Sequence, residues 1–323
     1  MSGTEQPKQY VIGIDMGGTN TKFGIVDARG NVLSQGGIKT SNPDINGYME
    51  ELKSGLNVLI NGVGGIKKIK AIGAGCPNGN YYTGNIEFAP NLPWKGVVPF
   101  AKMLSDTFGV PAAITNDANA AAVGEMTYGA AKGMKDFIMI TLGTGVGSGI
   151  VIDGKIVYGH DGFAGELGHT IIVRGENGRV CGCGRKGCLE TYTSATGVAR
   201  TAREFLQDSD RPSVLRNISP ENITSKDVFD AAMQNDELAK DVFQITGKIL
   251  GEAMADFVAF SAPEAIILFG GLTKAGDLIL KPVVESMEEN LLSIWKGKVK
   301  VIFSELKESD AAILGASALG WEL

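Results

Sequence analysis

Three of the four cysteines in this 323-residue chain fall within eight residues, as Cys181, Cys183 and Cys188. His169, one of only two histidines, stands twelve residues before the first of them. Thiolates and imidazoles are ligands that Zn²⁺ prefers, and four of them suit a closed structural site, because a catalytic zinc normally keeps one position open. The spacing therefore predicts a structural zinc site formed by His169 and the three cysteines.

Two carboxylic acids flank these candidate ligands. Glu166 stands three residues before His169, and Glu190 stands two residues after Cys188. A bound metal would hold both acids in place, and His169 could bind it through one ring nitrogen while the other nitrogen faces a substrate. The fourth cysteine, Cys76, lies far from this segment and is expected to be a small buried residue.

Two glycine-rich loops could bind phosphate. Their residues are Asp15, Gly17, Gly18, Thr19 and Asn20 in the first loop and Gly143, Thr144, Gly145 and Gly147 in the second. Glycine lets backbone N–H groups approach an anion closely. A single loop of this kind is more often an ordinary hairpin turn than a phosphate site, and neither loop matches the Walker A or dinucleotide-binding pattern. Two such loops in two related halves could clasp a polyphosphate between the halves.

Two further features fit a nucleotide site. Asp15 ends a predicted buried strand, where its carboxylate could hold Mg²⁺ through water. Gly270 and Gly271 follow another predicted strand and could form a third edge of the site, near the nucleoside. We therefore expect this site to bind a nucleotide together with Mg²⁺.

The segments that carry the two loops resemble each other. Residues 11–33 and 137–157 both read as strand, glycine-rich turn, strand, short Asp/Gly turn and strand. They are separated by about 125 residues, which indicates a duplicated domain and not a solenoid of short repeats. The duplication predicts a sheet in each half of the chain.

Other elements complete an α/β pattern. Short apolar runs predict strands, and alanine-rich or periodic segments predict helices, with Asn116 and Asp117 at the position of a helix N-cap. The expected strands are 71–75, 112–115 and 265–269, and the expected helices are 118–125, 241–260 and 309–319. Alternating strands and helices predict an α/β fold.

Composition excludes some classes of function. Apolar residues make up 44% of the chain and charged residues 20%, with a net charge of −6. A nucleic-acid-binding surface needs clustered basic residues, so none is expected. No run reaches the ~18 apolar residues of a membrane helix, and no secretory signal opens the chain. We expect a cytoplasmic protein without a membrane partner, in which cysteines stay reduced.

These motifs resemble the ROK family, which groups repressors, uncharacterised reading frames and sugar kinases. The resemblance runs from about residue 10 to residue 320. It rests on Asp15-Met-Gly-Gly-Thr-Asn, Ala89-Pro-Asn-Leu-Pro-Trp, Asn116-Asp-Ala-Asn, Leu142-Gly-Thr-Gly-Val-Gly-Ser-Gly, Gly165-Glu-Leu-Gly-His and Cys181-Gly-Cys-Gly-Arg-Lys-Gly-Cys-Leu-Glu. The family implies an actin-like ATPase fold with two ribonuclease-H-like domains around a cleft. Residues 1–117 with 308–323 would form the smaller domain, and residues 118–307 the larger.

The resemblance also implies ATP-dependent phosphorylation of a hexose, most often glucose at its 6-hydroxyl, by a homodimer or homotetramer. Asp117 matches the catalytic base, because a sugar hydroxyl must lose its proton as it attacks phosphorus; alternatively, Asp117 only caps a helix. The positions matching sugar contacts are Gly79, Asn91, Asn116, Asp117, Glu166, His169 and Glu190. Those matching nucleotide contacts are Asp15, Gly17, Gly18, Thr19, Asn20, Lys22, Gly143, Thr144, Gly145, Gly270 and Gly271. His169, Cys181, Cys183 and Cys188 match the zinc ligands.

One departure leaves the sugar open. The family usually carries a proline-glycine turn after the strand at 71–75, whereas this chain has Cys76-Pro-Asn-Gly-Asn-Tyr-Tyr82. Fructose, mannose, allose, N-acetylglucosamine and N-acetylmannosamine remain alternatives to glucose. A repressor is not expected, because family repressors carry an extra helix-turn-helix domain and only ten residues precede Val11. A non-catalytic sugar sensor is a third alternative, against which Asp117 and both loops argue.

Overall fold

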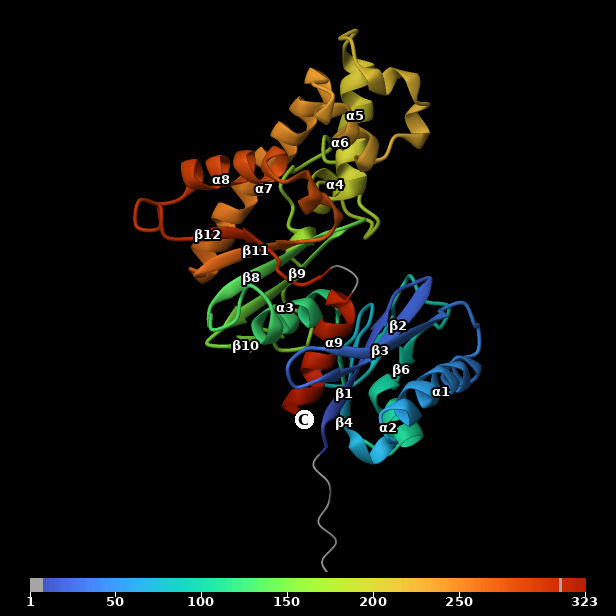
Figure 1. The fold of residues 1–323 in the computed structure, drawn as a ribbon. Coiled ribbons are helices and arrows are strands. Elements are labelled where there is room, and N and C mark those ends of the chain that lie inside the picture. The colour runs from blue at the N-terminus through green and yellow to red at the C-terminus, as the bar shows by residue number, and fades with distance from the viewer. Residues whose placement is uncertain (1–7, 308–309) are drawn as a thin grey trace, which may run out of the picture. The chain divides into compact units, whose positions relative to one another are not determined.

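The computed structural model describes residues 8–307 and 310–323, and Figure 1 draws their fold with most helices and strands labelled. Residues 1–7 and 308–309, including Ser309 at the expected start of the last helix, lie outside the described residues. The chain divides into two compact units. Unit 1 holds the described residues up to Met134, Gly149–Gly165 and the described residues from Glu305; unit 2 holds Lys135–Ser148 and Glu166–Ser304.

The first sheet has five strands in the order β3-β2-β1-β4-β7. Their bounds are Tyr10–Met16 (β1), Asn20–Asp27 (β2), Val32–Lys39 (β3), Ile69–Gly75 (β4) and Ala112–Thr115 (β7). The first three strands form an antiparallel meander, and β1, β4 and β7 run parallel. A two-stranded pair, β5 (Ile86–Glu87) and β6 (Val97–Val98), also belongs to this unit.

Helices pack against this sheet. They are α1 (Ile45–Gly62), α2 (Phe100–Phe108), α3 (Asp117–Tyr128) and α9 (Ala311–Glu322), with a 3-10 turn at Ile66–Lys68. Alternation along β1 separates two cores, since Ile12 and Ile14 pack with α1 and α2 whereas Val11 packs with α9. Helix α9 approaches the strand backbone so closely that a Cβ at Gly13 would lie 2.1 Å from the Ile313 carbonyl oxygen.

The second sheet repeats this plan in the order β10-β9-β8-β11-β12. Its strands are β8 (Phe137–Leu142), β9 (Val146–Ile152), β10 (Lys155–Ile156), β11 (Ala265–Phe269) and β12 (Lys300–Phe303). Strands β8, β11 and β12 are parallel, and β10 is antiparallel to β9. The duplication predicted from residues 11–33 and 137–157 is therefore confirmed, as is the α/β class.

The helices of unit 2 enclose its core. They are α4 (Glu190–Thr193), α5 (Ala195–Asp208), α6 (Ser225–Met233), α7 (Glu237–Ser261) and α8 (Asp277–Asn290), with 3-10 turns at Leu167–His169, Val214–Asn217, Pro220–Asn222 and Gly271–Ala275. Ile138 and Leu268 of the sheet pack with Val242 and Leu250 of α7. The helix predicted at 241–260 is α7, which begins earlier because the Asp236 carboxylate accepts a hydrogen bond from Ala239 N–H.

The units divide the chain differently from the boundary at residues 117 and 118 predicted from the sequence. Helix α3 belongs to unit 1, where Gly124 packs on Gly315 of α9, so close that a Cβ on Gly124 would lie 2.7 Å from the Gly315 Cα. Residues 149–165 join it, because Gly149 packs on Ala122 of α3. Among residues 8–307 and 310–323, no helix combines the length and apolar character needed to cross a membrane.

Candidate functional site

The four predicted metal ligands lie together in unit 2. The ligand atoms of His169, Cys181, Cys183 and Cys188 are all within 4.8 Å of one another. Cys183 Sγ and Cys188 Sγ are 3.7 Å apart, and Cys181 Sγ lies 3.8 Å from His169 Nδ1. Zn–S bonds of about 2.3 Å in a tetrahedron place neighbouring sulfur atoms about 3.8 Å apart. The donors and their spacing fit a tetrahedral zinc ion, and the cysteines are free thiols.

Tight turns bring the cysteines together. Cys181 N–H donates to the Arg185 carbonyl, and Gly184 N–H donates to the Cys181 carbonyl. Gly187 has φ +81°, and a Cβ there would lie 1.8 Å from the Val173 carbonyl oxygen, so only glycine fits. The glycines between the cysteines thus fold the chain back on itself.

The three thiols differ in acidity. Burial raises the pKa of Cys181 and of Cys188. Burial acts in the same direction on Cys183, but hydrogen bonds with Arg185 and with the two neighbouring thiols together outweigh it and lower the pKa of Cys183 to about 6. One thiolate is therefore available at neutral pH, and metal binding would release protons from the other two.

The acids that flank the cluster approach His169 from two sides. His169 Nε2 lies 4.0 Å from Glu166 Oε2, and its Nδ1 lies 3.8 Å from Glu190 Oε1. Cys181 Sγ donates a hydrogen bond of 2.9 Å to Glu190 Oε1. Nδ1 of His169 therefore faces the cysteines, and Nε2 faces Glu166.

Glu190 also contacts the second phosphate loop. Its Oε2 accepts a long hydrogen bond of 3.5 Å from Val146 N–H, and a Cβ on Gly145 would lie 2.7 Å from that same oxygen. The loop is fixed further by Ala195 N–H and the Thr196 hydroxyl, which donate to the carbonyls of Gly143 and Thr144. The cysteine cluster and the second loop therefore share one carboxylate.

A cavity of about 470 Å³ opens beside this loop within unit 2. Its wall brings Gly143 and Thr144 of the second loop together with Gly271, which is distant in sequence but was predicted for the same site. Its lining comprises Leu142, Gly143, Thr144, Ala195, Ser225, Lys226, Phe229, Asp230, Phe243, Gly271, Leu272, Lys274 and Ala275. Gly270 has φ +109° and packs against Leu142. The lining from α6 was missed because its sequence matches no nucleotide motif.

The first loop lies in unit 1 and is shaped by backbone contacts. Gly17 N–H donates to the Asn20 carbonyl, and the Thr19 carbonyl accepts from Thr40 N–H. A Cβ on Gly18 would lie 2.9 Å from the Asn91 carbonyl oxygen, so the first loop and the predicted sugar contact Asn91 are neighbours.

Two acids accompany the first loop. Asp15 pairs with Lys22 across β1 and β2. Burial, and then the negative charge of Asp117, raises the pKa of Asp15 to about 6, partly offset by Lys22. Burial also raises the pKa of Asp117. Cys76 is fully buried, as expected. Burial, and then the charges of both carboxylates, raise the pKa of its thiol. Each acid therefore disfavours ionisation of the other.

Asp117 is the first residue of α3 and not its N-cap. Asn116 is the cap, and its Oδ1 accepts a hydrogen bond of 2.7 Å from Asn119 N–H. Asp117 Oδ1 accepts a local hydrogen bond of 2.8 Å from Ala118 N–H. Gly79 packs on the end of β7, where a Cβ would lie 2.4 Å from the Thr115 carbonyl oxygen. Asn116 therefore caps the helix, and the alternative interpretation that Asp117 serves only as a cap does not hold.

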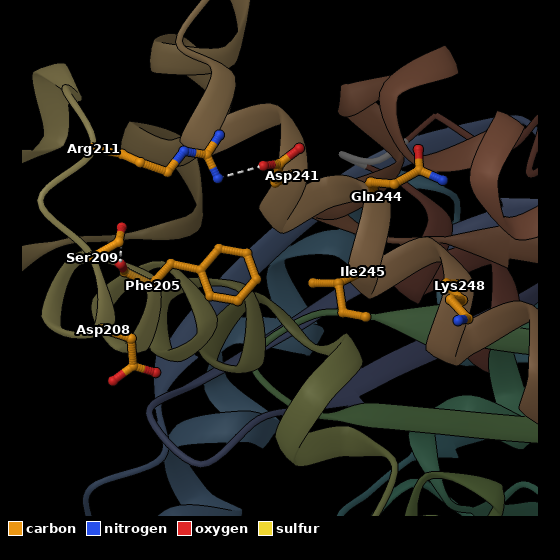
Figure 2. A pocket seen from close by; sticks show the side chains of 8 residues that line it. All are labelled: Phe205, Asp208, Ser209, Arg211, Asp241, Gln244, Ile245 and Lys248. Atoms are coloured by element: carbon orange, nitrogen blue, oxygen red, sulfur yellow. Dashed lines mark hydrogen bonds and ion pairs between the residues drawn. The ribbon is translucent and has the colours of Figure 1, made fainter.

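The predicted residues fall into two groups. Unit 1 holds Asp15, Gly17, Gly18, Thr19, Asn20, Lys22, Gly79, Asn91, Asn116 and Asp117; unit 2 holds Gly143, Thr144, Gly145, Glu166, His169, the three clustered cysteines, Glu190, Gly270 and Gly271. A second pocket in unit 2, shown in Figure 2, contains none of them. There Arg211 and Asp241 form an ion pair of 2.7 Å above the apolar Phe205 and Ile245.

The fold and site define a class: an α/β protein with two mixed five-stranded sheets, a glycine-rich loop on each and a Cys₃His cluster. The chain belongs to the ROK family, whose sequence profile matches residues 11–322. A glucokinase of Halalkalibacterium halodurans is 35% identical over 97% of this chain and 94% of its own.

Solved structures confirm the actin-like ATPase fold. A ROK family glucokinase from Streptomyces griseus, in complex with glucose and AMPPNP, superposes with a TM-score of 0.80 at 32% identity, covering 97% of this chain and all of its own. The family also reaches regulators: a xylose repressor of Caldicellulosiruptor bescii is 30% identical over 78% of this chain and 63% of the repressor. Relatives named as kinases and relatives named as repressors therefore share this fold.

Proposed function

We propose that this chain catalyses the ATP-dependent phosphorylation of a hexose, with glucose and its 6-hydroxyl as first choice. The observation that carries the proposal is the placement of Asp117. It stands at the start of α3 beside Asp15, while Asn116 performs the capping role. A carboxylate not needed for the helix, with a raised pKa, suits a general base.

Asp117 would accept the proton of the sugar hydroxyl as that oxygen attacks the γ-phosphorus of ATP. Phosphoryl transfer demands little covalent chemistry from a protein, so position and charge account for most of the catalysis. The raised pKa brings the carboxyl closer to the operating pH, where a base is most effective. Asp117 would thus be the residue that moves a proton.

The nucleotide would lie between backbone amides and the cavity of unit 2. Gly143, Thr144 and Gly145 present their loop beside that cavity, and Gly271 forms another part of its wall. Mg²⁺, when bound with ATP, supplies charge neutralisation between the phosphates. Asp15 would hold it through water, and Gly17 and its neighbours would approach the phosphates from unit 1.

The sugar would be bound by side chains from both groups. Glu166, His169 and Glu190 lie together around the cysteine cluster, while Asn91 and Asn116 belong to unit 1. The zinc would be structural, because all four of its ligands come from the chain and leave no open position. It would keep Glu190 and His169 in the orientation that hexose hydroxyls require.

The segment after β4 favours a second candidate, a kinase for another hexose or an N-acetylhexosamine. Asn78 adopts φ +50°, and its Nδ2 donates a hydrogen bond of 2.9 Å to the Glu87 carbonyl. Tyr81 stacks on Tyr158 with ring centroids 4.3 Å apart. These features replace the usual family turn, so the shape of the sugar pocket could differ from that of a glucokinase.

A coupled assay of ADP release tests the proposal. Purified protein with Mg·ATP would be offered glucose, fructose, mannose, allose, N-acetylglucosamine and N-acetylmannosamine in parallel. Turnover highest on glucose supports the first choice, and turnover highest on another sugar supports the second candidate. Silence on every sugar, with calorimetric binding of one of them, would reject the kinase in favour of a sugar sensor. The homodimer or homotetramer and the cytoplasmic location stay predictions.

A further inference from the structure

Arg179 is a buried arginine two residues before the first clustered cysteine. Arginine is rarely buried unless its charge and its N–H groups are satisfied. Here the main chain and the side chain of Arg179 are both bonded to the segment that follows the cysteines. These contacts lie outside the metal site and the phosphate loops, and they reach the element that carries Glu190.

The first set of contacts joins Arg179 to helix α4. Arg179 Nη1 donates a hydrogen bond of 2.8 Å to the Thr191 carbonyl, and its backbone N–H donates one of 3.0 Å to the Tyr192 hydroxyl. The guanidinium also lies over the Tyr192 ring, 4.4 Å from its centroid. The two residues that follow Glu190 are therefore both held by one arginine.

The second set anchors that arginine. Arg179 Nη2 donates to the Thr201 hydroxyl at 2.9 Å and forms an ion pair with Glu204, both on α5. The Arg179 carbonyl accepts a hydrogen bond of 2.8 Å from Gly187 N–H. Arg179 is therefore bonded at once to the cysteine turn, to α4 and to α5.

Helix α4 needs such support. It has only four residues, and among the described residues no side chain caps its N-terminus. So short a helix has almost no intrinsic stability, because nucleation costs more than one turn of hydrogen bonds returns. Glu190 is its first residue, so the orientation of that carboxylate depends on whatever holds the helix.

The cysteine side also contacts Glu190, through a hydrogen bond that depends on a thiol proton. The Cys181 thiol donates a hydrogen bond of 2.9 Å to Glu190 Oε1. A thiolate bound to a metal has no proton to donate, so this hydrogen bond is absent when the site is loaded. The contacts of Arg179 involve no thiol and no metal ligand.

We propose that Arg179 is a positioning residue for Glu190, acting through α4 and independently of the metal. The inference deepens the proposed function, because it takes Glu190 as a hexose contact. It predicts that the Glu190 carboxylate has two separable supports, the cysteine cluster and Arg179.

Arg179→Met tests this, with Arg200→Met as its matched control. Arg200 Nε binds the same Glu204 carboxylate at 2.9 Å, so the control removes one ion pair of Glu204 without touching α4. We expect Arg179→Met to raise the KM for the preferred hexose about tenfold, with kcat, the KM for ATP and the zinc content each within about twofold of wild type. Arg200→Met should leave all four unchanged, and Arg179→Lys should lie between.

Hydrogen exchange of the peptide spanning residues 189–194 gives a readout that does not need activity. It should speed up in Arg179→Met and stay unchanged in Arg200→Met. Unchanged exchange and unchanged hexose KM would overturn the inference, and so would loss of zinc in parallel with the KM. If Arg179→Met does not fold, the same comparison is made with Arg179→Lys. A wild type inactive on every hexose would reject the proposed function, while the exchange result would still decide the role of Arg179.

Discussion

The two glycine-rich loops have the same place in two related sheets but different surroundings. The first joins β1 to β2 and lies beside a pair of carboxylic acids, Asp15 and Asp117, whose pKa values are raised. The second joins β8 to β9, and its carbonyls and amides are bonded to side chains of neighbouring segments. Duplication supplied one backbone twice, and the side chains around it then diverged.

This difference divides the proposed chemistry. The first loop has charge that can move a proton or hold a cation, while the second is held by hydrogen bonds and borders a cavity. Substitutions near the first loop should therefore reduce turnover, whereas substitutions near the second loop should weaken substrate binding. Four experiments test that division.

Asp117→Asn should have the largest effect. The amide cannot take the proton of the sugar hydroxyl, so kcat should fall about 10²–10⁴-fold while the hexose KM changes less than about threefold. Steady-state kinetics measure both. Asp44→Asn, at the N-cap of α1 in the same unit, is the control and should retain wild-type kcat. Near-normal turnover in Asp117→Asn would reject Asp117 as the base.

Cys183→Ser should act mainly on binding. Loss of one thiolate ligand should lower the zinc content well below one ion per chain and raise the hexose KM about tenfold, because outer contacts of a metal site depend on the metal. Metal analysis and kinetics on the same preparation give both values. Cys76→Ala, which removes a thiol outside the cluster, should keep its zinc. Zinc loss with an unchanged hexose KM would contradict the coupling through His169.

Two glycines of the second loop form a matched pair. A Cβ on Gly145 would lie 2.7 Å from Glu190 Oε2, whereas a Cβ on Gly143 meets no atom of the described residues within 4 Å. Gly145→Ala should raise the hexose KM about fivefold by displacing the carboxylate, an effect within the range of mild overpacking. The hexose KM of Gly143→Ala should stay within twofold of the wild-type value. Equal effects in the two variants would show that the loop's contact with Glu190 has no role.

The smallest effect is on stability and depends on pH. Folded Asp15 keeps its proton up to pH about 6, whereas the unfolded chain releases it near pH 4. Folding stability is therefore lost as pH rises from about 4 to 6, and the loss is complete above that window. Asp15→Asn should raise Tm at pH 7.5 by about 2 °C and leave it unchanged at pH 4.

Asp27→Asn provides the control of opposite sign. Burial alone would raise the pKa of Asp27, but hydrogen bonds from Asn31 and Arg29 lower it. That carboxylate stabilises the fold above pH about 4, so its replacement should lower Tm at pH 7.5. Thermal melts at both pH values decide. A drop in Tm for Asp15→Asn at pH 7.5 would contradict the raised pKa.

Much of the fold could be read from local pattern. Strands β7 and β11 coincide with the predicted 112–115 and 265–269, because both are short apolar runs bounded by turn residues. The clustering of the three cysteines was also predictable, since they are close in sequence and the turns between them are short. Grouping His169 with them required only a spacing of twelve residues.

The rest depended on contacts between distant segments. Lys226 and Phe229 border the same cavity as Gly143, but α6 matches no motif and is separated from that loop by some eighty residues. The contacts of Arg179 were hidden for the same reason, since nothing in the sequence indicates burial of that arginine. The unit boundary differs from the prediction because α3 packs on α9, and pairing of helices so far apart leaves no local signal.

Helix α9 has a consequence for how the molecule is made. It lies on the backbone of β1 and β4 at Gly13 and Gly73, so the first strands of the chain have their partner at residues 311–322. While the ribosome is still translating unit 2, one face of the first sheet has no cover. Unit 1, although it holds the first strands, should therefore reach its native state only after residues 311–322 have been synthesised, the reverse of the usual N-terminal-first order. Closing so long a loop also makes this step slow.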